Sequence, residues 1–353
     1  MRRTEAVQGT RPIPDSLSYG QIVVAVEGII AVVTQSSWLA IVFAATLLAS
    51  ACTANGGAED TGTGTDPAST LTSRMPDQSA RTKMLLIVEE NKSYDQVVGA
   101  SEAPYLNRLA QTYGLATAYD AGYAVDCASL GAYLIMLSGD DHSACADVLP
   151  EALPVEGDNL FQQVAESGRE WRVYAESMPV ACDATNTSDG LYLVRHAPAP
   201  YFVSERGRCP RWDIPLGSSS SGPLVDDLAQ GTLPAFALVT PNACDDMHGA
   251  PSCSTDTVAA GDRWLSTLMP KILAGEDYRA GRLVVVIAWD EGTSTDNHIP
   301  AIVISPKTSH VVSSIPFTHC SLLRTFEEVL GLPLLGCAAE ATSMAHVFGL
   351  PAG

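Results

Sequence analysis

Short apolar runs that end abruptly in polar residues recur along the chain. The clearest are 85–88 and 283–289, and 235–239 repeats the pattern. Apolar runs without alternation are typical of strands buried on both faces of a parallel sheet. Further strands are predicted at 115–119, 171–175 and 299–304, and helices are predicted at 103–113, 159–166, 224–229, 258–273 and 321–330. This pattern predicts an α/β fold with a mostly parallel central sheet.

Acidic and amide side chains follow two of these runs directly. Glu90 and Asn91 come just after the first run, and Asp290 and Glu291 come just after the run at 283–289. Open α/β sheets bind their ligands at the carboxyl ends of the strands. Adjacent carboxylates repel each other unless a cation lies between them, so these four side chains predict a divalent metal site. Ordinary polar turns are the alternative interpretation.

Ser129 stands at the start of an apolar stretch, 126–139, that is predicted to be helical. The N-terminus of a helix has a positive local field, which stabilises an alkoxide or a bound phosphate oxygen. A serine at this position is therefore a candidate nucleophile. A simple N-cap explains the same residue equally well.

Histidines supply the candidate acids. His248 closes the polar segment 240–248 after the third apolar run, where it could bind a phosphoryl oxygen or protonate a leaving group, with Asp245 or Asp246 to orient it. His298 opens the predicted strand 299–304 and is a second candidate, while His319 precedes a predicted helix. The other histidines are interpreted as structural or exposed: His142, His196, His310 and His346.

Composition limits the classes of function. The chain has 353 residues, 46% of them hydrophobic, which suits one large domain with an N-terminal appendage. Its formal net charge is −20, and its 20 basic residues form no dense cluster. The sequence therefore predicts no nucleic-acid partner. The same acidity repels anions, so a phosphate site needs cations nearby.

The N-terminal part of the chain predicts export. Residues 21–51 are mostly apolar and end in small residues before Cys52, which suits a lipoprotein signal at 1–52 with a lipid on Cys52. An uncleaved membrane anchor is the alternative. Residues 53–82 have the composition of a flexible linker, and 83–351 form the predicted enzyme domain. We expect an exported protein, lipid-anchored at the cell surface or secreted, whose contact with the membrane is limited to this anchor.

Cysteine usage agrees with export. Eight of the 9 cysteines lie downstream of Cys52, and no C-x-x-C pair is present. An even number in an exported chain favours disulfides over a zinc site. Nearest-neighbour pairing predicts four bridges: Cys127 with Cys145, Cys182 with Cys209, Cys244 with Cys253 and Cys320 with Cys337.

An ordered set of motifs resembles a known family. ENKSYD, a serine before a helix, TPNACDDMH, WDEG, NHIP and HCSLLRTFEEVLGL are similar to the bacterial phosphoesterase family of acid phosphatases and non-haemolytic phospholipases C, over residues 84–350. The resemblance implies an alkaline-phosphatase-like three-layer α/β/α sandwich, a divalent metal and a transiently phosphorylated serine. By position it implies metal ligands at Glu90, Asn91, Asp290 and Glu291, the nucleophile at Ser129, and catalytic histidines at His248 and His298.

One segment departs from the family pattern. Short members commonly read H-P-S-L-P-N-Y around the nucleophile, whereas residues 127–133 read CASLGAY and keep only Ser129, Leu130 and Tyr133. The resulting hypothesis is an exported, metal-dependent phosphomonoesterase acting on small phosphate esters. A phospholipase C-like diesterase and a catalytically weakened surface binding protein of the same fold are the alternatives.

Overall fold

A central sheet organises the computed structural model, which describes residues 81–123, 127–351 and 353. Within these residues the sheet has eight strands in the order β4-β3-β5-β1-β6-β7-β2-β8. β7 is antiparallel to β6 and β2, and the other pairs are parallel. The strands are β1 Lys83–Glu89, β2 Gly114–Ala116, β3 Trp171–Ala175, β4 Asp213–Pro215, β5 Phe236–Thr240, β6 Leu283–Trp289, β7 Ala301–Ile304 and β8 Val311–Ser313. The predicted mostly parallel sheet is confirmed.

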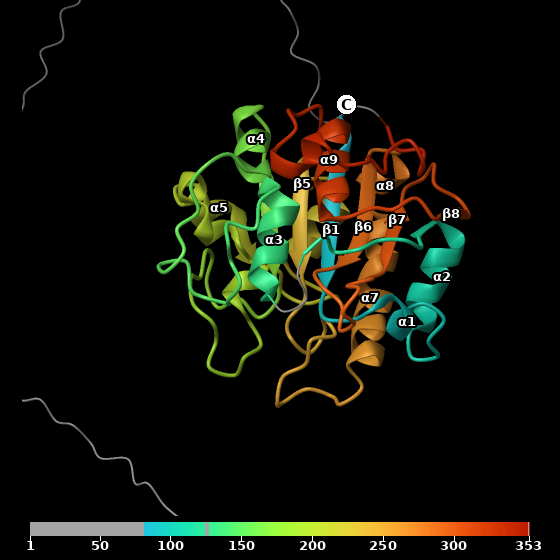
Figure 1. Ribbon diagram of the computed structural model, residues 1–353, viewed down its shortest axis with the longest axis horizontal. Helices are drawn as coiled ribbons and strands as arrows, with labels where there is room; N and C mark the ends of the chain where they lie inside the picture. Colours follow the sequence, from blue (N-terminus) through green and yellow to red (C-terminus); the bar gives the residue numbers. More distant parts are fainter. Residues whose placement is uncertain (1–80, 124–126, 352) are drawn as a thin grey trace, which may run out of the picture. The chain divides into compact units, whose positions relative to one another are not determined.

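Helices cover both faces of the sheet. Figure 1 shows α3 and α9 in front of the strands and α7 and α8 behind them. The α-helices are α1 Tyr94–Val97, α2 Pro104–Thr112, α3 Ser129–Ser138, α4 Leu160–Glu166, α5 Cys209–Trp212, α6 Pro223–Gln230, α7 Thr257–Ala274, α8 Glu276–Arg279 and α9 His319–Leu330. The predicted three-layer α/β/α arrangement is confirmed.

β1 and β6 lie side by side at the centre of the sheet, and all their residues are buried. Their parallel register pairs Lys83 with Leu283 and Glu89 with Trp289, so the two strands end at the same level. The residues that follow, Glu90 and Asp290, therefore emerge together at the carboxyl edge. This register is what places acidic groups from distant parts of the chain side by side.

Helix α3 is buried along its whole length. Its N-cap is Ala128, and Ser129 is the first helical residue, with no capping hydrogen bond from a side chain. The N-cap interpretation of Ser129 is therefore wrong. Gly131 stands where the family has a proline, and a Cβ there would collide with the hydroxyl of Tyr123. Close packing accounts for this departure from the family pattern.

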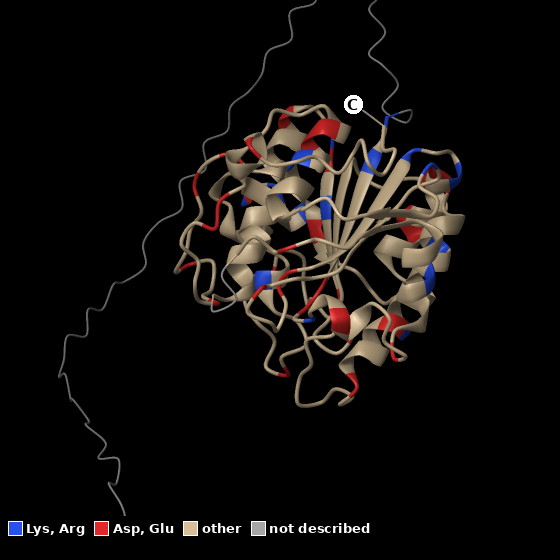
Figure 2. Ribbon diagram, turned by 45° about the vertical axis from the view of Figure 1, so that its right-hand side comes forward, with Lys and Arg blue, Asp and Glu red and all other residues tan. Residues whose placement is uncertain are grey.

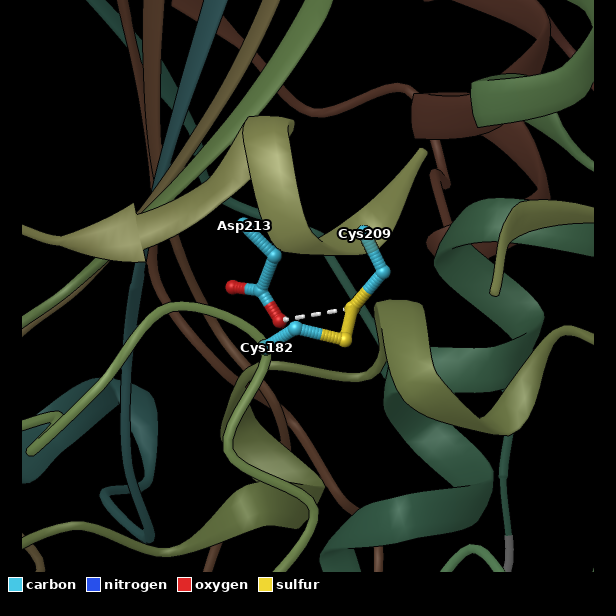
Figure 3. Close-up of side chains that lie close together, drawn as sticks. All are labelled: Cys182, Cys209 and Asp213. Carbon is cyan, nitrogen blue, oxygen red and sulfur yellow. Dashed lines mark hydrogen bonds between the residues drawn. A yellow bond between two sulfur atoms is a disulfide. The ribbon is translucent and has the colours of Figure 1, made fainter. Parts of the chain in front are cut away.

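All four predicted disulfides are present: Cys127–Cys145, Cys182–Cys209, Cys244–Cys253 and Cys320–Cys337. Figure 3 shows the Cys182–Cys209 bridge beside Asp213, whose Oδ2 lies 3.6 Å from Cys209 Sγ. A disulfide sulfur has no proton, so this contact requires a protonated carboxyl as donor. Burial, with the charge of Asp183, raises the pKa of Asp213 well above its usual range. Because both thiols are joined, this cluster does not offer thiolate ligands to a metal.

Residues 182–221, for which no helix or strand was predicted, contain several short elements. These are α5, β4 and three 3₁₀ turns, η2 Val194–His196, η3 Ala199–Tyr201 and η4 Val203–Glu205. β4 pairs with β3 alone, at the end of the sheet. A strand of three residues that ends in proline has no long apolar run, so the sequence pattern did not reveal it.

The predicted signal 1–52 and nearly all of the predicted linker 53–82 lie outside the described residues. The lipid site predicted at Cys52 lies there too. In the part of the chain that is described, no helix has the length and apolar character needed to span a membrane.

Candidate active site at the carboxyl edge of the sheet

The loops after β1 and β6 form the centre of the site. The backbone N–H of Asn91 donates to Asp290 Oδ1 at 3.0 Å, and Asn91 Nδ2 donates to Glu90 Oε2 at 3.2 Å. Asn91 has a φ of 53°, a left-handed conformation that asparagine tolerates and that turns the chain sharply after β1. Glu90 and Asp290 are fully buried. The structure thus brings three of the predicted metal ligands together.

Helix α3 presents two hydroxyl groups to the same carboxylate. Ser129 Oγ donates to Glu90 Oε2 at 3.5 Å, and Tyr133 Oη donates to Glu90 Oε1 at 2.6 Å. The two residues are four apart on one helix face, which explains why both reach the end of β1. The predicted nucleophile therefore lies in direct contact with a predicted metal ligand.

His196, which the sequence led us to interpret as structural or exposed, lies within the cluster around Glu90. It is buried in η2, with Nε2 3.3 Å from Glu90 Oε1 and Nδ1 3.4 Å from Asp246 Oδ2. Its ring stacks against Tyr133 at 5.4 Å between centroids. A single histidine in a short 3₁₀ turn follows no periodic pattern, so no local signal marks it.

Asp246 also makes different contacts from those expected. It was considered as a group that orients the His248 side chain, but its Oδ1 accepts the backbone N–H of His248 at 2.7 Å. Its other oxygen faces His196, as described above. Asp246 is buried, and its backbone oxygen accepts the N–H of Glu90 at 2.7 Å. It therefore belongs with the buried carboxylates.

The other histidines considered from the sequence, His248, His298 and His319, differ in how they are placed relative to this cluster. His248 is exposed at its rim, 6.2 Å from His196 between ring centroids. His298 stacks on Tyr94 at 4.5 Å, and its Nε2 lies 3.0 Å from Thr117 O, so the structure does not bring it into contact with Ser129 or Glu90. His319 Nε2 donates to the backbone oxygen of Asp290 at 2.6 Å, which fixes the loop after β6.

Burial dominates the electrostatics of the cluster. Burial, reinforced by the Asp290 and Asp246 charges, raises the pKa of Glu90 well above its usual range. Burial and the Asp290 charge raise the pKa of Glu291 to about 8, although the Ser129 hydroxyl opposes the rise. Burial lowers the pKa of His196, so its imidazole is neutral. Figure 2 shows further acidic residues, in red, around the lower ends of the strands.

These side chains fit a divalent cation. Ligand atoms of Glu90, His196 and Asp246 all lie within 4.8 Å of one another. Several buried atoms have no hydrogen-bond partner among the described residues: Asp246 Oδ2, Asp290 Oδ2, Glu291 Oε2 and His196 Nε2. Unpartnered buried carboxylates are costly, and a cation would neutralise them. Carboxylate oxygens with a neutral imidazole form a donor set that binds such ions.

Comparison with known proteins agrees with this geometry. Residues 100–333 match the model of the phosphoesterase family, a range that begins shortly after Glu90 and Asn91. The chain is 26% identical over 272 residues to the phosphatidylinositol-3-phosphatase of Mycobacterium tuberculosis (strain ATCC 25618 / H37Rv), a match that covers 75% of this chain and 82% of that protein.

Two solved structures share the fold. One is a protein in the alkaline phosphatase superfamily from Vibrio parahaemolyticus, with a TM-score of 0.50, 14% identity, and coverage of 71% of this chain and 66% of that one. The other comes from work on glycosaminoglycan metabolism by Bacteroides thetaiotaomicron, with a TM-score of 0.51, 11% identity, and coverage of 76% and 82%. The family match spans most of the described residues, and the chain therefore belongs to the phosphoesterase family and is a phosphoric ester hydrolase.

Proposed function

We propose that the protein is an exported, metal-dependent phosphomonoesterase that works through a phosphoserine at Ser129. The observation that carries this proposal is the contact between Ser129 Oγ and Glu90 Oε2, inside a buried cluster of carboxylates and one imidazole. The serine hydroxyl makes no helix cap, so it is available for chemistry. The N-terminus of α3 adds a positive field at the same oxygen.

Six side chains are our proposed metal-binding set. Four of them are the ligands expected from the sequence: Glu90, Asn91, Asp290 and Glu291. The structure adds His196 and Asp246, which group with Glu90. A bound divalent cation would draw charge from the phosphoryl oxygens and lower the pKa of the nucleophile.

The residues of the chain then have separate tasks. Ser129 Oγ attacks phosphorus in line with the leaving group, and its proton passes to Glu90 Oε2, the oxygen to which the hydroxyl is hydrogen-bonded. The new O–P bond forms as the bond to the leaving oxygen breaks. His248 is exposed at the rim of the cluster, where it would give a proton to that oxygen. Water then attacks the phosphorus of the phosphoserine and gives a proton to His248, while the serine O–P bond breaks and the serine oxygen takes back its proton from Glu90.

The altered segment at 127–133 does not favour the weakened binding protein. Cys127 is used in a disulfide with Cys145, and Gly131 avoids a collision with Tyr123. These two departures therefore have structural reasons that leave Ser129 in place, and the retained Tyr133 binds Glu90. The relative from Mycobacterium tuberculosis is named for a phosphomonoester of a lipid headgroup, which supports a monoester substrate and makes phosphoinositides a substrate class to test.

Export is part of the proposal. Four disulfides are typical of proteins that fold outside the reducing cytoplasm, which supports a location at the cell surface or beyond it. A lipid anchor at Cys52 stays a prediction.

The test compares an aryl phosphate monoester with the corresponding diester, with and without a chelator. We expect the monoester to be the better substrate, chelation to abolish turnover, and added divalent metal to restore it. Phosphate release that survives exhaustive chelation would contradict the metal site.

Ser129→Ala tests the nucleophile directly. We expect nearly complete loss of turnover with an almost unchanged melting temperature, because the variant deletes one hydroxyl that caps nothing. Ser138→Ala is the matched control: it removes a buried serine hydroxyl from the same helix, where that hydroxyl donates to Leu134 O at 2.8 Å. Full turnover in Ser129→Ala would refute the nucleophile.

A further inference from the structure

The guanidinium of Arg195 lies beside the site but has no role in the set described above. Arg195 immediately precedes His196 in η2, and its side chain is 11% exposed. Its Nε lies 3.0 Å from Asp147 Oδ2, while neither Nη has a hydrogen bond to any described residue. The next residue, His196, lies 3.3 Å from Glu90 Oε1 and 3.4 Å from Asp246 Oδ2. Arg195 is therefore one residue away from a side chain that contacts the carboxylate cluster.

Asp147 connects Arg195 to the helix that carries the nucleophile. Its Oδ2 pairs with Arg195, and its Oδ1 accepts the backbone N–H of Leu130 at 3.2 Å, one residue after Ser129. The position of Arg195 is thus fixed by the ion pair on one side and by the neighbouring residue His196 on the other. A guanidinium held in this way loses little side-chain entropy when it binds a ligand.

The site needs such a cation. A phosphate ester must approach a cluster of buried carboxylates in a protein with a formal net charge of −20. Lys92 directly follows Asn91 and is a second cation beside the cluster. Lys92 Nζ already donates to Met247 O at 2.7 Å and to Asn91 O at 3.1 Å. Arg195 differs because its two Nη groups are unused within the described residues.

We propose that Arg195 binds the substrate phosphoryl group and gives the enzyme its preference for phosphate monoesters over diesters. The inference rests on the proposed function and adds a specificity residue to it. A guanidinium makes two parallel N–H···O bonds to a phosphoryl group. The electrostatic attraction between the guanidinium and the phosphoryl group grows with the charge on that group. The dianion of a monoester should therefore bind to Arg195 more strongly than the monoanion of a diester.

Arg195→Gln tests the inference on the full-length protein. We expect kcat/KM for p-nitrophenyl phosphate to fall roughly 10- to 100-fold, the range of one or two charge-assisted hydrogen bonds. We expect a clearly smaller loss for bis(p-nitrophenyl) phosphate, and weaker competitive inhibition by inorganic phosphate. Arg195→Lys keeps the charge without the planar fork, so its preference for the monoester should lie between those of the wild type and Arg195→Gln.

Two control variants separate substrate binding from a structural role. Asp147→Asn breaks the ion pair but keeps an acceptor for Leu130 N–H. It should therefore lower kcat/KM for the monoester less than Arg195→Gln does. Arg208→Gln removes a guanidinium paired with Glu205 at 3.0 Å, without a contact to the cluster, and should leave both substrates unaffected. Equal losses for both esters in Arg195→Gln, or the same losses in Asp147→Asn, would overturn the inference.

Failure of the proposed function has a different signature. If the wild type hydrolyses neither ester, the proposed function fails, and titration calorimetry with inorganic phosphate still decides the role of Arg195. Weaker phosphate binding by Arg195→Gln and by Arg195→Lys than by the wild type supports the inference. Unchanged phosphate binding by folded Arg195→Lys overturns it, even where Arg195→Gln does not fold.

Discussion

The phenolic hydroxyl of Tyr133 donates a 2.6 Å hydrogen bond to Oε1 of Glu90, while Ser129, one turn earlier on α3, donates to Oε2 of the same carboxylate. Burial raises the pKa of Glu90, and the Tyr133 hydrogen bond opposes that rise. Tyr133 therefore favours the ionised form of Glu90 and fixes its orientation. It acts on the site through Glu90, as a positioning residue.

Tyr133→Phe should weaken metal binding without unfolding the protein. The ring stays stacked on His196, and only the hydrogen bond to Glu90 is lost. Loss of a hydrogen bond that orients a metal ligand typically lowers metal affinity about 10- to 100-fold. Titration calorimetry with a divalent metal measures this change. Tyr201→Phe is the control, because its hydroxyl donates to Val148 O at 2.6 Å; equal effects in both variants would contradict the prediction.

His196→Asn tests whether the buried imidazole beside Glu90 is a metal ligand. Its Nε2 is buried and 3.3 Å from Glu90 Oε1, without a hydrogen-bond partner among the described residues. If the imidazole is a metal ligand, the variant should bind metal at least ~10-fold more weakly. Elemental analysis after dialysis gives the bound metal. His310→Asn, at an exposed position, is the control, and equal metal content in all three proteins would remove His196 from the ligand set.

The central strands were predictable because burial on both faces leaves a continuous apolar run. β3 and β6 have the bounds that the sequence predicted. The strands at the ends of the sheet, β4 and β8, have three residues each and were not predicted. A short strand that pairs on one side has too few residues to show a period.

The residues of the candidate site likewise differ in how far they could be predicted from the sequence. Glu90 and Asp290 were predictable because each directly follows a recognisable strand, and the parallel register brings them together. His196 was not, because its position depends on the fold of the loops between β3 and β4 and on contacts with Glu90 and Asp246. Long-range contacts of this kind leave no local pattern in the sequence.

Reduction should destabilise the protein. The structure has four disulfides, and loss of a native disulfide typically costs ~2–5 kcal/mol. We expect a clearly lower melting temperature in the presence of a thiol reductant. Thiol titration of the unfolded, unreduced protein gives an independent check, and more than one free thiol per chain would contradict the complete set of bridges, because only Cys52 of the 9 cysteines lies outside them.

Glu327 on α9 makes stability depend on pH. Its Oε1 accepts the backbone N–H of Leu335 at 2.9 Å, and its buried Oε2 has no hydrogen-bond partner among the described residues. Burial raises the pKa of Glu327 from its ordinary value of 4.5 to about 8. The folded state therefore favours the protonated carboxyl.

The sign of the effect follows from linkage. A carboxyl whose pKa is raised by folding contributes stability that is fully present below its unfolded pKa and is lost as the pH rises through its folded pKa. For Glu327 that window runs from about pH 4.5 to about pH 8. Glu327→Gln keeps the acceptor for Leu335 and stays neutral throughout. The melting temperature of the variant, relative to the wild type, should therefore rise steadily between pH 5 and pH 8. A difference that stays constant over this range would show that Glu327 is not protonated in the folded protein.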